Sequence, residues 1–211
     1  MSFGKIALII VGILVVIGVI LALSVSGMFN RIVTLEQGAN AAWAQVQNVY
    51  QRRADLVPNL VNTVKGAANF ERSTLTEITE ARASVGRVQM PSEAPKDPQQ
   101  FAEFERAQGQ LGSALSRLLV VAERYPDLKA TAAFRDLQAQ LEGTENRISV
   151  ERGRFNEAVQ AYNTAIKRFP AVLFAGMFGY SPRPYFTSTP GAETPPKVDF
   201  DFETKAVPKQ T

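Results

Sequence analysis

The sequence predicts an all-α protein: an N-terminal transmembrane helix, an antiparallel up-and-down four-helix bundle and a disordered C-terminal tail. Three observations predict this architecture. Residues 6–25 are apolar and uncharged, and apolar residues recur at spacings of three and four between residues 30 and 168. Alternating runs and hairpin-turn dipeptides, which are typical of strands, are missing from the sequence. The expected divisions are an anchor at 1–29, a bundle at 30–170, an apolar Gly/Pro segment at 171–186 and a tail at 187–211.

The stretch of twenty uncharged residues at 6–25 is typical of a membrane-spanning helix. At ~1.5 Å per residue it is ~30 Å long, which matches the hydrocarbon thickness of a bilayer. A cleaved signal peptide is the alternative, because a small-x-small triplet occurs at 22–24, but the apolar part of such peptides is usually only about 7–15 residues. We therefore expect an uncleaved single-pass anchor. Lys5 and Arg31 flank the span symmetrically, so the charge rule leaves the side of the bundle open.

Two bundle helices are expected between the anchor and residue 86. A break at 24–27 and Asn30 as N-cap place the start of the first helix at residue 30. Its apolar positions are Ile32, Leu35, Ala39, Ala42, Val46 and Val49. Because proline lacks the backbone donor that a helix interior needs, Pro58 predicts a tight turn or sharp kink at 53–57. A second helix should then run to about Gly86.

Two further helices follow a proline-rich loop at residues 90–98. Asp97, directly before Pro98, indicates the start of the third helix. Its apolar stripe comprises Phe101, Phe104, Gln108, Leu111, Leu115, Leu118 and Ala122. Pro126 ends that helix, because the residue before a proline is disfavoured in the α region, and the fourth helix should extend to Arg168. Long helices joined by short connections favour antiparallel packing.

The segment 171–186 is apolar and contains Gly and Pro. An even number of antiparallel helices returns the chain to the membrane-proximal end, where Tyr and Phe beside Arg favour the bilayer interface. Folding back onto the bundle is the alternative. The candidate side chains for a membrane-interface or oligomer contact are Phe174, Phe178, Tyr180, Arg183, Tyr185 and Phe186. From residue 187 onward, Pro, Thr, Lys and acidic residues predict a disordered tail.

The composition excludes several classes of function. The chain has no His and no Cys, so zinc sites that need them, Glu-x-x-His di-iron sites and triads with a His base are impossible. The formal net charge of +3 is small, which argues against nucleic acid as a partner. Phosphate-binding loops and nucleophile elbows are missing. We predict a protein that is not an enzyme and has no cofactor or metal.

One polar cluster interrupts the apolar stripe of the fourth helix. Glu145 follows Thr144 on the stripe, and Glu151 takes the next position after Ile148. A carboxylate buried there must be paired, because a lone buried charge costs several kcal/mol. We expect a buried ionic network that fixes the helix register, and a ligand or cation site is the alternative. The candidate members are Arg52, Arg53, Arg82, Glu145 and Glu151.

Several short motifs resemble the LemA family. They are WAQVQ (43–47), RRADLVPNLV (52–61), TEAR (79–82), YPDLK (125–129), LEGTENRI (141–148), FN (155–156), YN (162–163), FP (169–170) and PRPYF (182–186). The resemblance covers about residues 28–186 in order, with Phe70 standing where the family pattern has a His. It implies a single-pass bacterial membrane protein with an antiparallel four-helix bundle, and it implies no biochemical activity. One branch of the family is associated with magnetosome membranes, a role that the resemblance does not carry over.

The leading hypothesis is a membrane-anchored helical scaffold at the bacterial cytoplasmic membrane, which associates with itself through its helices and the segment 171–186. Its expected partners are the lipid bilayer, further copies of the chain and other membrane proteins. A sensor that binds a ligand or cation at the polar cluster of the fourth helix is one alternative. An accessory subunit of a membrane protease or transporter is another.

Overall fold

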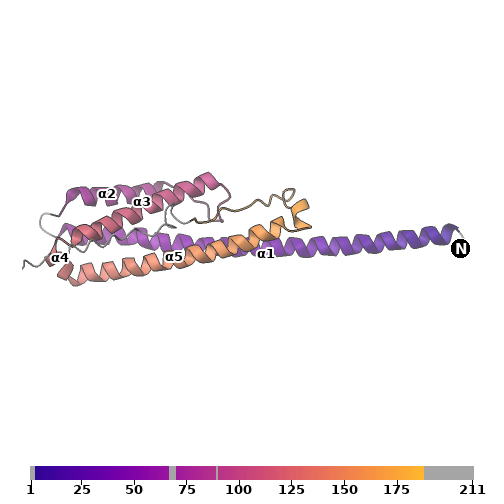
Figure 1. Ribbon diagram of the computed structural model, residues 1–211, viewed down its shortest axis with the longest axis horizontal. Coiled ribbons are helices and arrows are strands. Elements are labelled where there is room, and N and C mark those ends of the chain that lie inside the picture. Colours follow the sequence, from indigo (N-terminus) through magenta and orange to yellow (C-terminus); the bar gives the residue numbers. More distant parts are fainter. Residues whose placement is uncertain (1–2, 67–69, 89, 188–211) are drawn as a thin grey trace, which may run out of the picture.

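The computed structural model describes residues 3–66, 70–88 and 90–187. In these residues the chain is all-helical and forms no strand, which confirms the predicted fold class. The helices are α1 Phe3–Lys65, α2 Arg72–Arg87, α3 Pro98–Ala122, α4 Pro126–Ala130, α5 Ala132–Lys167 and the 3₁₀ turn η1 Ala171–Leu173. The bundle and the long N-terminal helix share one axis (Figure 1).

Helix α1 is uninterrupted over 63 residues, so the predicted break at 24–27 is wrong. The hydroxyls of Ser24 and Ser26 donate to the carbonyl oxygens one turn earlier, those of Ile20 and Ala22, at 2.8 and 2.9 Å. A hydroxyl that bonds to its own helix needs no water, so these serines do not end the helix even at the edge of an apolar span. The polar residues that suggested a break are therefore part of the continuous helix α1.

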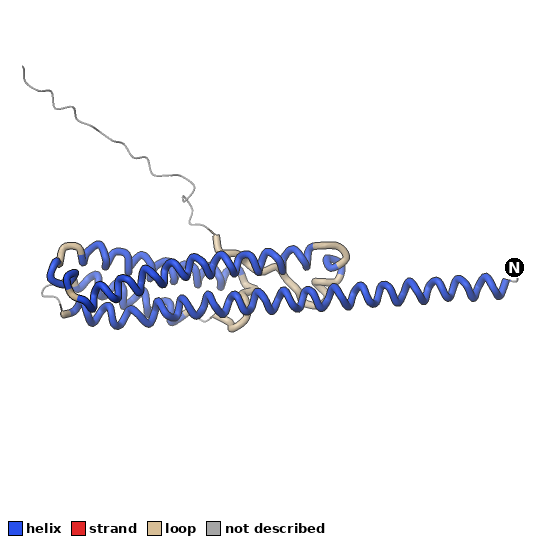
Figure 2. The backbone as a smooth tube through the Cα atoms, turned by 90° about the horizontal axis from the view of Figure 1, so that it is seen from below, coloured by secondary structure: helices blue, strands red, loops and turns tan. Residues whose placement is uncertain are grey.

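The first part of α1 extends beyond the bundle, and no other described element lies beside it (Figure 2). It contains a window that is long and apolar enough to cross a membrane, none of which is buried. Asn30, the expected N-cap, lies inside the helix, and Ile32 is 2% exposed where α1 enters the bundle. The boundary predicted at 29/30 is thus no structural break, and one helix contains both the apolar stretch and one wall of the bundle.

Helix α1 also passes through Pro58, so the predicted turn at 53–57 is wrong. Proline has no N–H, which leaves the carbonyl of Ala54, four residues earlier, without its helical donor. Arg82 of α2 supplies the missing hydrogen bond, because its Nε donates to the Ala54 oxygen at 3.1 Å. The helix continues because a neighbouring helix satisfies the group that proline orphans.

The second helix is shorter than predicted, since the first part of the expected stretch belongs to α1. The loop before α3 and the start of α3 agree with the prediction. Pro98 occupies the first turn, and Asp97 accepts a hydrogen bond from the Gln99 N–H at 2.8 Å, which satisfies one of the free donors of that turn.

The expected fourth helix is divided into α4 and α5 by Thr131. The Thr131 hydroxyl accepts a hydrogen bond from the Phe134 N–H at 3.3 Å, so a threonine cap restarts the helix with a change of direction. Helix α5 ends at Lys167, one residue before the predicted end. The overall path remains up and down, because α4 is a single turn at the far end of the bundle (Figure 1).

The helices pack mainly as two antiparallel pairs, α1 with α5 and α2 with α3 (Figures 1 and 2). The core between them is apolar and includes Leu111 and Phe155, which have no exposed surface. Trp43, the one tryptophan of the chain, is equally buried. Its ring centroid lies 5.4–6.4 Å from those of Phe101, Phe104, Phe155 and Phe186. Phe186 belongs to the C-terminal segment, which therefore completes the core.

The residues after α5 form two parts with different surroundings. Residues 169–180, which we call the foot, contain η1 and rest on α1, where Phe29 contacts the rings of Phe178 and Tyr180. Residues 181–187, which we call the strap, run back along the bundle. The predicted tail, 187–211, lies outside the described residues except for Thr187.

This division corrects the prediction for the segment 171–186. Arg183 and Phe186 are only 2% and 6% exposed inside the bundle, so the predicted membrane contact is wrong for them. Phe178 remains 54% exposed in the foot and Tyr185 40% exposed in the strap, and two further foot residues are half-buried, namely Phe174 and Tyr180. Composition could not separate the two parts, because both contain aromatic residues and proline.

Candidate functional site

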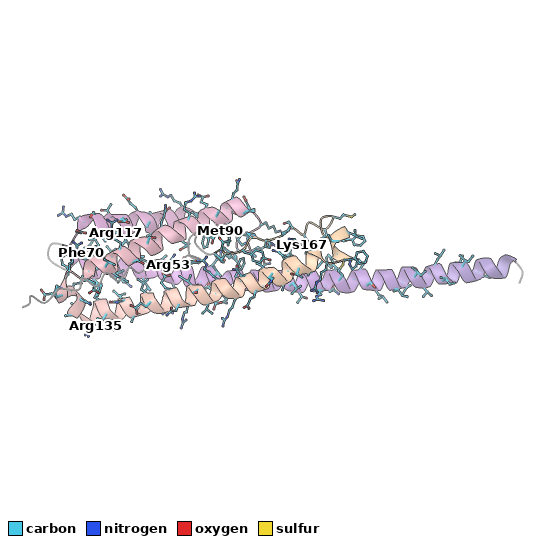
Figure 3. All side chains as sticks on the ribbon, in the orientation of Figure 1. Arg53, Phe70, Met90, Arg117, Arg135 and Lys167 are labelled. Atoms are coloured by element: carbon cyan, nitrogen blue, oxygen red, sulfur yellow. The ribbon has the colours of Figure 1, made fainter. Side chains whose placement is uncertain are left out.

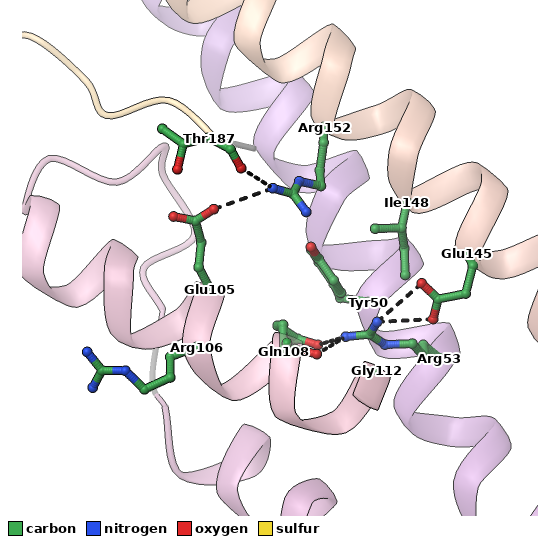
Figure 4. A pocket seen from close by; sticks show the side chains of 11 residues that line it. Tyr50, Arg53, Glu105, Arg106, Gln108, Gly112, Glu145, Ile148, Arg152 and Thr187 are labelled. Carbon is green, nitrogen blue, oxygen red and sulfur yellow. Dashed lines mark hydrogen bonds and ion pairs between the residues drawn. The ribbon is translucent and has the colours of Figure 1, made fainter. Parts of the chain in front are cut away.

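A polar pocket of about 410 Å³ lies among α1, α3, α5 and the end of the strap (Figure 4). Arg53, which projects into it, marks its position midway along the bundle (Figure 3). Gly112 of α3 lies beside that side chain, and a Cβ atom there would be 3.4 Å from the Arg53 Nη1. We call this cavity the central pocket. Its main polar lining consists of Tyr50, Arg53, Glu105, Gln108, Glu145 and Arg152.

Arg53 connects three helices through the central pocket. Its Nη1 lies 3.0 Å from the Glu145 carboxylate on α5, and its Nη2 donates to the backbone oxygen of Gln108 on α3 at 2.8 Å. The Gln108 side-chain oxygen accepts a second bond from Nη2, and the guanidinium lies 5.0 Å from the Tyr50 ring centroid. The side chain is 4% exposed, yet its Nε has no hydrogen-bond partner in the described part of the chain. One buried cation thus fixes the register of the bundle and retains an unused donor.

A second cation closes the outer side of the central pocket. Arg152 of α5 donates to Glu105 on α3 at 3.4 Å and to the backbone oxygen of Thr187 at 3.1 Å, and its guanidinium lies 4.5 Å from the Phe186 ring centroid. Burial raises the pKa of Glu105, against the opposing effects of Arg152 and a backbone hydrogen bond from Thr187. The carboxylate therefore holds the end of the strap at an energetic cost.

The chemistry that the central pocket offers is hydrogen bonding and ion pairing. Burial raises the pKa of Tyr50, despite the nearby Arg152 and Arg53, so the phenol stays a neutral donor and acceptor. Arg53 pairs with Glu145 and Arg152 pairs with Glu105 across the cavity, and Arg106 also lines it, so the lining carries one more cation than anions. In the described part of the chain, no group of three or more acidic side chains is placed to hold a metal ion.

The structure brings together only two of the five residues expected in the ionic network, Arg53 and Glu145. Even this pair is half-open, since the Glu145 side chain is 44% exposed. Arg52 faces solvent, and Arg82 donates its hydrogen bond to the Ala54 carbonyl near Pro58. Glu151 forms an ion pair with Arg154, one turn further along the same helix, at 2.8 Å. The expectation of a single buried network is wrong for these three.

Sequence reasoning missed Gln108, Arg152 and Glu105 as pocket residues. Gln108 carried a detectable signal, because it is a polar residue on the apolar stripe of the third helix, and the structure shows it 5% exposed. Arg152 was one of several polar residues in the predicted fourth helix, and the sequence indicated no partner for it. Glu105 carried no signal, since its role depends on where the strap ends.

Two asparagines of α5 hold the strap in place. Asn163 donates to the backbone oxygen of Arg183 and accepts from its N–H, both at 2.9 Å, and Asn156 makes the same pair of bonds with Phe186 at 2.9 Å. Seven helical residues rise ~10.5 Å, and three extended residues span ~10 Å, so the two spacings match. The strap therefore runs antiparallel to α5 in a fixed register.

The Arg183 side chain makes a second buried ionic contact, on the side of the central pocket that faces the foot. It is fully buried, lies 2.6 Å from the Glu36 carboxylate of α1 and donates to the backbone oxygen of Ala94. Its guanidinium lies 5.7 Å from the Tyr162 ring centroid. The strap thus ties α1, α5 and the loop before α3 together, which explains a charged residue inside the core.

Comparison with known proteins places this arrangement in a family. The sequence profile of the LemA family matches residues 42–200, from the middle of α1 to beyond the strap. The chain belongs to the LemA family. The matched part contains the central pocket, Pro58 with Arg82, and both asparagines that hold the strap, so the resemblance in the motifs is confirmed.

Individual relatives of this LemA-family chain are distant. The magnetosome protein MamQ of Magnetospirillum gryphiswaldense is 25% identical over 189 residues, which cover 79% of this chain and 67% of the relative. MamQ 1 of Paramagnetospirillum magneticum is 25% identical over 205 residues, 90% of this chain and 75% of the relative. Protein LemA of Metamycoplasma hominis is 22% identical over 143 residues, 68% and 61% of the two chains. With the exposed apolar part of α1, these relationships identify a membrane-associated protein.

Proposed function

We propose that this chain is a non-catalytic scaffold of the bacterial cytoplasmic membrane, anchored by one span and associating with further copies of itself. The observation that carries the proposal is the continuity of α1 from Phe3 to Lys65. A flexible linker lets a tethered domain reorient freely, whereas a helical connection acts as a semi-rigid spacer. A continuous helix therefore supports a scaffold, because it couples the orientation of the bundle to that of the span.

The rigidity of the connection follows from the packing of the bundle. At ~1.5 Å per residue, the 63 residues of α1 measure ~95 Å, and the bundle half of this rod packs along α5. Arg53 and Arg183 of the strap, both buried, lock that half at two levels through ion pairs with Glu145 and Glu36. A tilt of the span is therefore a tilt of the whole bundle.

The surface of the span supports self-association. Gly18, Ala22 and Ser26 recur every four residues on one face of α1, and nothing lies within 4 Å of a Cβ atom placed on Gly18. Small residues at this spacing allow two membrane helices to approach closely. The Ser26 hydroxyl bonds within its own helix at 2.9 Å, so the face stays apolar in character.

The test is the mass of the full-length protein in detergent and in lipid nanodiscs. Wild-type protein should run as an oligomer. Gly18→Leu with Ala22→Leu should reduce it to a monomer, whereas Val19→Leu, a matched change on another face of the same helix, should not. A strictly monomeric wild type, or the same mass for all variants, would refute self-association through this face.

A second candidate function is a sensor that binds a small polar ligand in the central pocket. The observation that favours it is the Arg53 Nε, a buried donor without a partner at a cavity wall. A ligand with an acceptor group would satisfy this donor. Glu145→Gln should then abolish a ligand-dependent rise in melting temperature, while Glu142→Gln, an exposed neighbour, should preserve it. A broad ligand screen without any such rise would retire this candidate.

A further inference from the structure

A second crevice lies at the opposite end of the bundle from α4, between α1, the end of α5 and the foot. Its volume is about 530 Å³. This is the end from which α1 continues alone, marked by Lys167 in Figure 3. The side chains that matter for its chemistry are Met28, Arg31, Leu35, Thr164, Arg168 and Phe169.

Among the residues that the structure describes, those lining the crevice include two cations and no anion. Arg31 of α1 and Arg168 after α5 both line it, and the lining includes no Asp or Glu. Among the described residues, neither arginine forms an ion pair or a side-chain hydrogen bond, in contrast to Arg53 and Arg183 in the bundle. Glu36, five residues further along α1, is already held by Arg183 at 2.6 Å. Two guanidinium groups thus remain available to one ligand.

The foot forms an apolar ridge beside these arginines. Met177 and Phe169 are 82% and 81% exposed, and Leu173, Phe178 and Val172 are 53–60% exposed. The ridge is firmly attached, because Ala171 and Ala175 are buried in a cluster with Ile32, Tyr162 and Ile166. Adjacent exposed apolar side chains on a held surface indicate an interaction site.

The height of the crevice places it at the polar edge of a bilayer. The apolar stretch of α1 ends at residue 25, and the crevice begins two residues later at Gly27. Arg31 lies six residues beyond the stretch, or ~9 Å along the helix, and headgroup regions add ~5–8 Å on each side of the hydrocarbon. An arginine side chain can reach back over the remaining distance.

We propose that this crevice binds the phosphate headgroup of an anionic phospholipid, with Arg31 and Arg168 on the phosphate and the ridge of the foot among the acyl chains. Arginine pairs match phosphate geometry, and basic residues near aromatic ones are typical of membrane interfaces. Because the crevice directly follows the proposed membrane span on α1, we expect its ligand to be a membrane lipid. The inference rests on the proposed membrane anchor and extends it, since the bundle then stands on the bilayer at two points.

The first test measures lipid retained by the full-length chain on release from nanodiscs, by native mass spectrometry. Nanodiscs of phosphatidylcholine with phosphatidylglycerol are compared with pure phosphatidylcholine. Wild-type protein should retain phosphatidylglycerol, and Arg31→Gln with Arg168→Gln should weaken retention about 30-fold, because each basic residue at an anionic surface contributes about fivefold in affinity. Arg135→Gln with Arg147→Gln, two exposed arginines of α5, is the matched control and should retain lipid as wild type does.

Three results would overturn the proposal. They are equal retention by the crevice variant and its control, no preference for phosphatidylglycerol, and full displacement of the lipid by inorganic phosphate, which would indicate a site for the free ion. Flotation of the same proteins with pure phosphatidylcholine vesicles separates this failure from failure of the anchor. Protein that floats but retains no anionic lipid lacks the crevice site, whereas protein that does not float lacks the anchor.

The second test measures the depth of the foot. Because the chain has no Cys, Met177→Cys carries a single nitroxide, and Val150→Cys, an exposed apolar residue of α5 within the bundle, is the control. In nanodiscs the label at 177 should be more accessible to oxygen and less accessible to a water-soluble nickel complex than the label at 150. Equal accessibilities, or spin–spin broadening at 177 from a second copy covering the foot, would contradict the proposed lipid contact.

Discussion

The pairing of Pro58 with Arg82 makes a quantitative prediction about stability. Arg82→Met removes the donor that satisfies the Ala54 carbonyl at 3.1 Å but keeps an unbranched side chain of good helix propensity. A hydrogen bond from a charged donor contributes about 1.5–3 kcal/mol. Since Arg82 is exposed and water can partly replace it, we expect a loss of about 1 kcal/mol.

The same substitution should cost almost nothing when Pro58 is replaced by Ala. Alanine restores the backbone N–H, so the Ala54 carbonyl regains its helical donor and no longer needs Arg82. The double-mutant cycle of Pro58→Ala and Arg82→Met should therefore show a coupling of about 1 kcal/mol, above the 0.3–0.5 kcal/mol scatter of independent sites. Arg87→Met, an exposed arginine of the same helix, should cost the same in both backgrounds.

The assay is denaturant unfolding of full-length protein in detergent, followed by the fluorescence of Trp43. This residue is the one tryptophan of the chain and is fully buried among aromatic rings, so its signal reports on the bundle. An Arg82→Met cost that is equal in the wild-type and Pro58→Ala backgrounds would refute the reasoning, because the arginine would then stabilise the protein by some other contact.

Three further predictions concern the strap, the central pocket and the foot. Asn163→Ala leaves two buried backbone groups of the strap without hydrogen bonds, so it should lower the free energy of unfolding by about 2–4 kcal/mol. It should also speed amide hydrogen exchange at residues 181–187. The same unfolding free energy and exchange rates as in wild type would contradict this prediction. Burial raises the pKa of Glu105, so the contribution of this side chain to stability falls as the pH rises through that pKa. The melting temperature of wild type minus that of Glu105→Gln should therefore increase on acidification. A difference that does not change with pH would contradict this prediction. Gly179→Ala should cost about 1–2 kcal/mol in thermal unfolding because its φ is 77°, whereas Gly176→Ala should be nearly neutral, and equal costs would argue against the positive φ.

Sequence patterns predicted the helices wherever the signals were local. The stripe of α3 and the Asp97 cap were predicted from periodicity and capping chemistry, and both are present. The end of α5 near Arg168 followed from the FP motif in the same way. These features depend on neighbours a few residues away, so one sequence is sufficient to predict them.

The two breaks wrongly predicted in α1 involve polar groups whose hydrogen-bond partners the sequence rules for helix ends do not consider. Ser24 and Ser26 look like linker residues, but each bonds to its own helix. Pro58 does orphan a carbonyl, as the rule states, but the compensating donor comes from Arg82, 24 residues later. A helix can therefore continue through a local break signal when tertiary structure supplies the missing hydrogen bond.

The site was predictable only in part for a related reason. The contact of Arg53 with Glu145 was within reach, since a carboxylate on an apolar stripe needs a cation. Gln108 joins that contact and Arg152 pairs with Glu105 beside it, because α3 and α5 flank one cavity and the strap closes it. Arg183 suggested a membrane contact because it stands among aromatics and prolines, but Asn163 draws it into the bundle. The periodicity of the helices does not predict where the segment after the last helix packs.

The proposed rigid connection between the span and the bundle can be tested directly by measuring a distance. Leu23→Cys and Asn48→Cys, both exposed on α1, accept spin labels without competing cysteines. Twenty-five helical residues separate them by ~38 Å. In nanodiscs we predict one narrow distance distribution near this value, as narrow as that of an Asn30→Cys and Asn48→Cys pair within the bundle. A broad distribution, or a second population at shorter distance, would reveal a hinge at 24–27 and contradict the account of a scaffold built on one continuous helix.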